Sequence, residues 1–140
     1  MAEALTGLGA AAAASQFLVY SVKITFFMCE LYGRLQDAPE NVREQASRIQ
    51  ELGSVAETIK ANPSLQNDAV VKSTLEACTD TAKLIQGRLE KTAVAVGDGW
   101  KKKRQKAVMA VFAEKDIVKL FGKLEGCKST LSLCIASVDV

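Results

Sequence analysis

The sequence contains no histidine, and this absence excludes several kinds of active site. Histidine is the commonest general base and the usual partner of a serine or cysteine nucleophile, so no Ser-His or Cys-His pair can form. A zinc site would need all four cysteines, and their spacing contains no C-x-x-C pair. No G-x-x-x-x-G-K-[ST] loop occurs either. We predict that the chain is not an enzyme and has no cofactor, no metal and no small-molecule substrate.

Proline and aromatic residues are also scarce, with two prolines, one tryptophan and an aromatic content of 6%. Alanine, leucine, lysine and glutamate are abundant, and no segment alternates with the period of two that a strand requires. Apolar residues instead recur every three or four positions. This pattern predicts helices over about residues 4–35, 39–62, 65–95, 100–112 and 115–137.

Charge is missing from the 19 residues between Ala4 and Val22, and the apolar character continues past Lys23 to Met28. A helix of that length reaches roughly 28 Å, close to the thickness of a bilayer's hydrocarbon core. However, alanines fill much of the run, so we expect no permanent membrane span. No basic residue precedes the run, which argues against a secretory signal. We predict a buried helix that can enter a membrane after a conformational change.

The candidate residues for membrane insertion are the large apolar side chains of this helix. They are Leu5, Leu8, Phe17, Leu18, Val19, Tyr20, Val22, Ile24, Phe26, Phe27 and Met28.

Four long helices joined by short turns predict an all-α fold, a helical bundle of four long helices plus a short basic helix. Because the N-terminal helix is apolar on all sides, we expect it at the centre of the bundle. Residues 1–140 should form a single domain. The apolar three-and-four spacing of the last helix continues almost to Val140, so we expect a domain cut from a longer protein.

The cysteines fall on or beside apolar stripes, which favours buried free thiols in a reducing cytoplasm.

A basic segment precedes the last helix and has two interpretations. Trp100, Lys101, Lys102, Lys103, Arg104 and Lys106 place five cations within six positions after a tryptophan. Such a patch suits anionic lipid headgroups, and tryptophan favours a membrane interface. Alternatively, the patch is a solvated helix start and Trp100 closes the end of the bundle. We do not expect nucleic-acid binding, because aromatic residues do not alternate with the cations.

The order of these features resembles a known family. The chain opens with Met1-Ala2-Glu3-Ala4-Leu5, has Gln16-Phe17 and Tyr20-Ser21-Val22-Lys23 in its first helix, and starts its second at Pro39-Glu40. Trp100-Lys101-Lys102-Lys103 and Lys128-Ser129-Thr130-Leu131-Ser132-Leu133 follow. This order resembles the N-terminal domains of fungal STAND (NLR-like) proteins, above all the sesA-type domain, which precede a NACHT or related NTPase module. The HeLo and HeLo-like cell-death domains are related to it.

The resemblance implies an effector domain of a fungal immune receptor that acts in regulated cell death and heterokaryon incompatibility. Its partners would be further copies of itself or a downstream NTPase module, and anionic membrane lipids. The implied location is the cytoplasm, and the plasma membrane upon activation. The alternative is a non-toxic adaptor bundle that relays receptor oligomerisation to another protein, with residues 100–112 as the contact surface.

Overall fold

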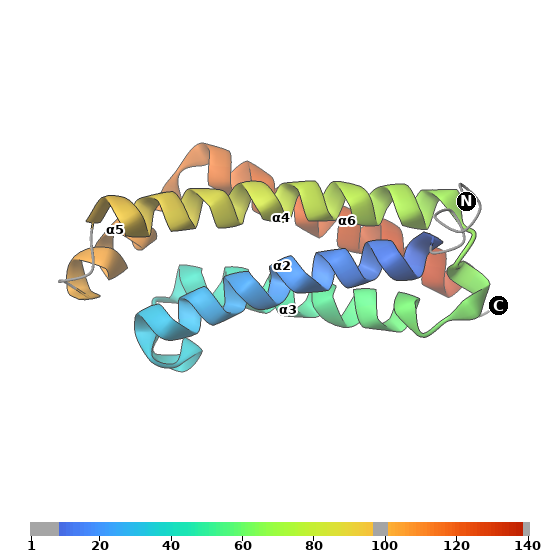
Figure 1. Ribbon diagram of the computed structural model, residues 1–140, viewed down its shortest axis with the longest axis horizontal. Coiled ribbons are helices and arrows are strands. Elements are labelled where there is room, and N and C mark those ends of the chain that lie inside the picture. Colours follow the sequence, from blue (N-terminus) through green and yellow to red (C-terminus); the bar gives the residue numbers. More distant parts are fainter. Residues whose placement is uncertain (1–8, 97–100, 139–140) are drawn as a thin grey trace.

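The computed structural model describes residues 9–96 and 101–138, and these residues form helices without strands (Figure 1). The long helices are α2 (Gly9–Tyr32), α3 (Glu40–Lys60), α4 (Ala69–Val96) and α6 (Lys115–Val138), and α5 (Lys101–Ala113) is shorter. Two 3₁₀ turns, η1 (Leu35–Asp37) and η2 (Pro63–Leu65), lie in the connections on either side of α3. The predicted all-α bundle of four long helices and a short basic one is confirmed.

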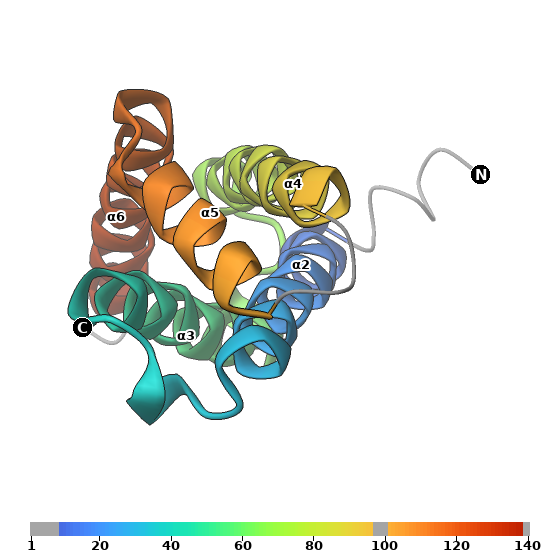
Figure 2. The ribbon, with the colours of Figure 1, turned by 90° about the vertical axis from the view of Figure 1, so that its left-hand side faces the viewer.

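The four long helices form a ring, and successive ones run in alternate directions (Figures 1 and 2). Around this ring α2 packs against α3, α3 against α6, α6 against α4, and α4 against α2. Figure 2 shows α5 lying across one end of the ring. The short connections enforce this up-and-down order, because each helix must return beside the one before it.

The prediction that the N-terminal helix occupies the centre is wrong. Only 28% of the most apolar window of α2 is buried, and α2 lies at the side of the bundle between α3 and α4. A ring of four helices has no central position in which one helix is surrounded by the others. Each helix contributes one face to a shared core and leaves the opposite face outside. The alanine-rich composition of α2 therefore did not decide its place.

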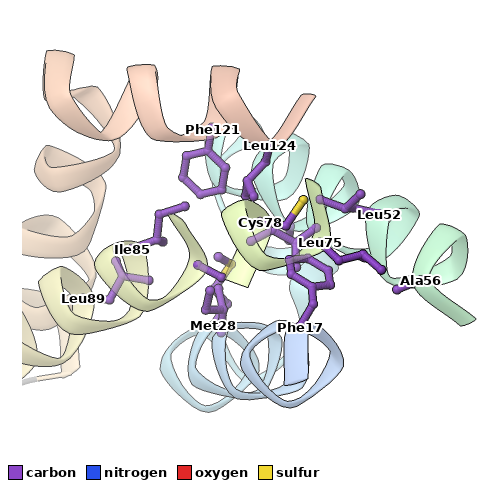
Figure 3. Packing of buried hydrophobic residues seen from close by; sticks show 14 of the residues in the cluster. Phe17, Met28, Leu52, Ala56, Leu75, Cys78, Ile85, Leu89, Phe121 and Leu124 are labelled. Atoms are coloured by element: carbon purple, nitrogen blue, oxygen red, sulfur yellow. The ribbon is translucent and has the colours of Figure 1, made fainter. Parts of the chain in front are cut away.

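The core is one cluster of buried apolar side chains drawn from all five helices (Figure 3). Phe17 and Met28 enter it from α2, opposite Leu75 and Ile85 of α4. Buried positions recur along each helix at the intervals of the helical period, so each helix buries one stripe of side chains. At the α5 end, the rings of Phe112 and Phe121 stack with their centroids 5.6 Å apart, which ties α5 to α6.

Gln66 closes the opposite end of the bundle by satisfying two helix ends at once. Its backbone oxygen accepts a hydrogen bond from the amide of Ala10, and its side-chain oxygen accepts one from Ala11 at 2.7 Å. The side-chain amide nitrogen donates to the carbonyl oxygens of Ile59 and Asn62. These are groups that a helix leaves without intrahelical partners, at the start of α2 and the end of α3.

Candidate membrane-contacting surface

Helix α2 carries large apolar side chains on its outer face as well as on its buried face. Its large buried side chains, Phe17, Ile24, Met28 and Leu31, follow one another at intervals of seven, four and three residues. On the outer face Val19, Val22 and Phe26 are 51%, 65% and 62% exposed. We call these three residues the α2 strip. An apolar strip of this kind on the surface of a folded domain indicates a contact surface.

The other predicted insertion residues are divided between the core and its edge. Phe17, Ile24 and Met28 are buried, whereas Leu18, Tyr20 and Phe27 are half-buried against the core. Leu5 and Leu8 lie outside the described residues. The eleven candidates are therefore not one surface, and the α2 strip is the part of the set that is available while the bundle stays folded.

An apolar groove runs beside the strip, between α2 and α3. The residues that line it are Leu18, Ser21, Val22, Thr25, Phe26, Cys29, Gln50, Gly53, Ser54 and Glu57. Gly53 lines the groove at a point where α3 approaches α2 closely. A Cβ atom at position 53 would lie 3.2 Å from the hydroxyl oxygen of Ser21 and 3.8 Å from a methyl carbon of Leu18. The two helix backbones approach closely where both positions are small.

Sequence reasoning did not find this groove. A glycine in the middle of a helix is unfavourable by about 1 kcal/mol relative to alanine, so Gly53 itself indicated a close approach of another element. The partner of that approach could not be read from the sequence, because Ser21 lies 32 positions away in another helix.

The side of α2 that faces α4 carries charge. The ring of Tyr20 is close to two cations, the ammonium of Lys23 at 5.3 Å and that of Lys83 in α4 at 5.6 Å from the ring centroid. Such contacts each contribute about 0.5–1 kcal/mol at exposed sites. Further along this side, Glu30 is exposed and lines a hollow with Lys101 and Arg104 of α5. The α2 strip is thus bordered by charged residues on one side and by the apolar groove on the other.

The basic segment lies at the C-terminal end of α2. The side chain of Gln105 donates to the carbonyl oxygen of Leu31 at 3.0 Å, and the Tyr32 hydroxyl donates to the carbonyl oxygen of Gln105. Burial raises the pKa of Tyr32 above its ordinary value, so its hydroxyl keeps the proton that this bond requires. These bonds bring the basic patch and the apolar helix, which are remote in sequence, to the same end of the molecule.

Within the basic patch, Lys101, Lys102, Lys103 and Lys106 are exposed, and Arg104 is half-buried. Trp100 lies outside the described residues. The first turn of α5 contains no acidic residue. Lysines at a helix N-terminus face the positive end of the helix dipole, which is unfavourable for them, and bound anionic groups would offset that.

Two of the four cysteines are in contact. The thiol of Cys78 in α4, which is buried, shares a hydrogen bond with that of Cys127 in α6. This bond lowers the pKa of Cys127 from 9.0 to about 7, against the opposing effect of burial. The same bond and burial raise the pKa of Cys78. Cys29 and Cys134 are half-buried and all four are free thiols, so the prediction of buried positions holds for Cys78 alone.

The sequence matches no protein-family model, no curated protein and no solved structure. Among the described residues, α2 is the one helix long and apolar enough to cross a membrane, a criterion that core helices of soluble proteins also meet. No group of three or more potential metal-ligating side chains is found in the described part of the chain.

Proposed function

We propose that this chain is the N-terminal effector domain of a fungal NLR-like immune receptor. In this proposal, oligomerisation of the receptor releases α2 toward the plasma membrane, and several copies together permeabilise it and cause regulated cell death. The downstream NTPase module and the other copies of the chain are the protein partners, and anionic lipids are the membrane partner.

The α2 strip is the observation that carries the proposal. Phe17, Ile24 and Met28 are shielded from water in the bundle and would be shielded again in hydrocarbon, so moving them changes their free energy little. The strip differs, because water covers more than half of each of its side chains in the folded bundle. Transfer to lipid would bury them and contribute about 1 kcal/mol or more for each. The net driving force for membrane entry thus comes from the outer face of α2.

Two effects oppose the release of a single copy. Lys23 and Glu30 must be moved toward the hydrocarbon, at a cost of about 2.5–3.5 kcal/mol for a charge at the centre of a helix. The core faces of α3 and α4 that α2 covers would also become exposed. Assembly of several copies allows both costs to be shared, since the charges can face one another and the uncovered faces can pack together.

The basic patch supports the approach to the membrane. Each lysine near an anionic surface contributes about 1 kcal/mol of attraction. Since α5 lies beside the C-terminal end of α2, lipid bound by Lys102, Lys103 or Lys106 would lie near that end of the apolar helix.

Dye release from vesicles tests the proposal. The full chain, clustered through a fused oligomerising domain, should permeabilise vesicles of phosphatidylcholine with phosphatidylserine more than vesicles of phosphatidylcholine alone. Phe26→Glu should abolish the leakage, since it places a charge on the strip without touching the core. Val118→Glu is the matched control, because Val118 is 52% exposed and belongs to α6, which lies diagonally opposite α2 in the ring (Figure 2). Intact vesicles with the clustered chain, or equal loss of leakage in both variants, would contradict the proposal.

A second candidate function is that of an adaptor bundle, and one surface of α5 favours it. A hollow beside α5 is lined by Tyr32, Asp37, Pro39, Lys102, Gln105, Lys106 and Met109, and Met109 is 45% exposed. An apolar side chain next to two lysines suits a partner segment that carries an apolar residue and carboxylates.

Hydrogen exchange separates the two functions. The adaptor keeps α2 protected when it is bound to its partner, whereas the effector loses protection over residues 9–32 when it acts on vesicles.

A further inference from the structure

The α2 strip has the spacing of a helix–helix seam. Val19, Val22 and Phe26 are separated by three and four residues, and Cys29, which is half-buried, continues the series by three. This alternation of three and four is that of the a and d positions by which one helix packs along another. The bundle leaves the strip more than half exposed, so none of the described helices covers the seam.

The charges that flank the seam are arranged for a second copy of the same helix. Lys23 and Glu30 each follow a d position directly, so both occupy e positions, seven residues apart on the same side. In an antiparallel helix pair the e positions of the two helices face each other. A twofold axis midway between the two charges places Lys23 of each copy opposite Glu30 of the other. Two ion pairs form by symmetry.

A parallel pair gains no such contacts. In that arrangement an e position faces a g position of the other helix, and the g positions here are Leu18 and Thr25, which carry no charge. The charge pattern therefore selects the antiparallel orientation as well as the partner.

The geometry around the seam leaves room for the second helix. On the α3 side the strip is bordered by the apolar groove, which extends along α2 from Leu18 to Cys29 and so covers the length of the seam. The same surface thus carries projecting side chains and a depression beside them. An interface between identical subunits that is related by a twofold axis requires such a self-complementary surface.

We propose that two copies of this chain associate through α2 as an antiparallel, twofold-symmetric helix pair whose axis passes close to Phe26. The pair buries Val22 and Phe26, the two strip residues nearest the axis, and forms one Lys23–Glu30 ion pair on each side of the axis. Val19 faces position 34, beyond the end of α2 at Tyr32, and stays outside the contact. This inference goes beyond the proposed function and does not depend on membrane activity. It provides a state in which Val22 and Phe26 are covered, and separation of the two copies would precede contact of these two side chains with lipid.

Charge exchange tests the pairing with the full chain. Sedimentation equilibrium should show a dimer. Its dissociation constant should rise about tenfold in each single variant, Lys23→Glu and Glu30→Lys, because each change replaces two attractive pairs by two repulsive ones. The double variant Lys23→Glu/Glu30→Lys restores opposite charges and should return the constant to about that of the unchanged chain. Lys119→Glu, an exposed lysine of α6, should have no effect.

Phe26→Ser gives an independent test, since it should yield a monomer with unchanged circular dichroism, whereas Val118→Ser should leave the dimer intact. A monomer at every concentration, or a double variant as weak as the single ones, overturns the inference. These outcomes are separate from vesicle leakage: a dimer that never permeabilises vesicles contradicts the proposed function alone, and a leaking monomer contradicts the pairing alone.

Discussion

Gly53 of α3 lies against Ser21 of α2, so closely that a Cβ atom at position 53 would be 3.2 Å from the serine hydroxyl oxygen. The contact joins the two helices that border the apolar groove, and both residues line that groove. Small residues on both sides let the helix backbones approach, and the outward faces of α2 and α3 then form one continuous surface.

Enlarging Gly53 should separate the two helices. Gly53→Val should lower the free energy of unfolding by about 1–3 kcal/mol, because the added methyl groups meet Ser21 and Leu18. Gly87→Val is the matched control, since nothing lies within 4 Å of a Cβ atom at position 87 of α4. Its effect should be small, since valine is also a slightly better helix former than glycine. Urea unfolding followed by circular dichroism measures both, and equal effects would show that the close approach is unimportant.

Gly9 should tolerate no side chain. Its φ of +41° is a conformation that other residues rarely adopt, and a Cβ atom there would collide with the carbonyl oxygen of Gln66. Gly9→Ala should destabilise the protein by about 1–3 kcal/mol. Gly122→Ala, at an open position within α6, should stabilise it by about 0.5–1 kcal/mol. Thermal unfolding of the two variants should therefore shift in opposite directions, and a shift in the same direction would contradict the structure.

The side chain of Gln66 should stabilise both helices that it contacts. Gln66→Ala leaves the amide of Ala11 and the carbonyl oxygens of Ile59 and Asn62 without this partner, at a cost of about 1–3 kcal/mol. Hydrogen exchange at the Ala11 amide should accelerate. Gln50→Ala, at an exposed position in α3, should change neither quantity. Unchanged exchange at Ala11 in the Gln66 variant would rule out the proposed role of its side chain.

Cys127 should be the thiol that reacts near neutral pH. Its pKa of about 7 means that the reactive thiolate forms as the pH rises through 7, rather than through the ordinary 9.0. In a chain that carries Cys29→Ser and Cys134→Ser, the alkylation rate plotted against pH should have its midpoint near 7. Adding Cys78→Ala removes the hydrogen-bond donor and should move the midpoint upward, whereas Cys78→Ser keeps a donor and should keep it low. If the midpoint is the same whichever residue occupies position 78, another group lowers the pKa of Cys127.

The individual helices were predictable because their causes are local. The three-and-four spacing of Val42, Ala46 and Ile49 defines one buried stripe of α3, and all three are buried as that spacing requires. Asn62 and Pro63 end that helix for a reason that also lies within a few residues, since proline disfavours helical backbone in the residue before it. The basic segment that begins α5 was likewise visible as a run of neighbouring cations.

The contact surface was not predictable in the same way. The exposed Gln16, Lys23 and Glu30 form one narrow polar stripe on α2, and the rest of its circumference is mostly apolar, so the pattern left several faces that could enter a core. The expectation of a central helix followed from this broad apolar surface, and the ring of helices overturned it. The pairing of Cys78 with Cys127 was hidden for a related reason, since 49 positions separate two residues that two different helices bring together.

By itself, then, the order of residues determined which segments are helical, how long they are and where they turn, since these depend on neighbours within one or two turns. Tertiary packing alone decided which side of α2 lies inside, where α3 approaches it at Gly53, and that the basic helix lies beside its C-terminal end. The physical reason is that the hydrophobic effect is non-directional: it depends on how much apolar area is buried, not on which face of a helix supplies that area. A helix that is apolar on most of its sides can present several faces to a core, and the fit of the other helices selects one.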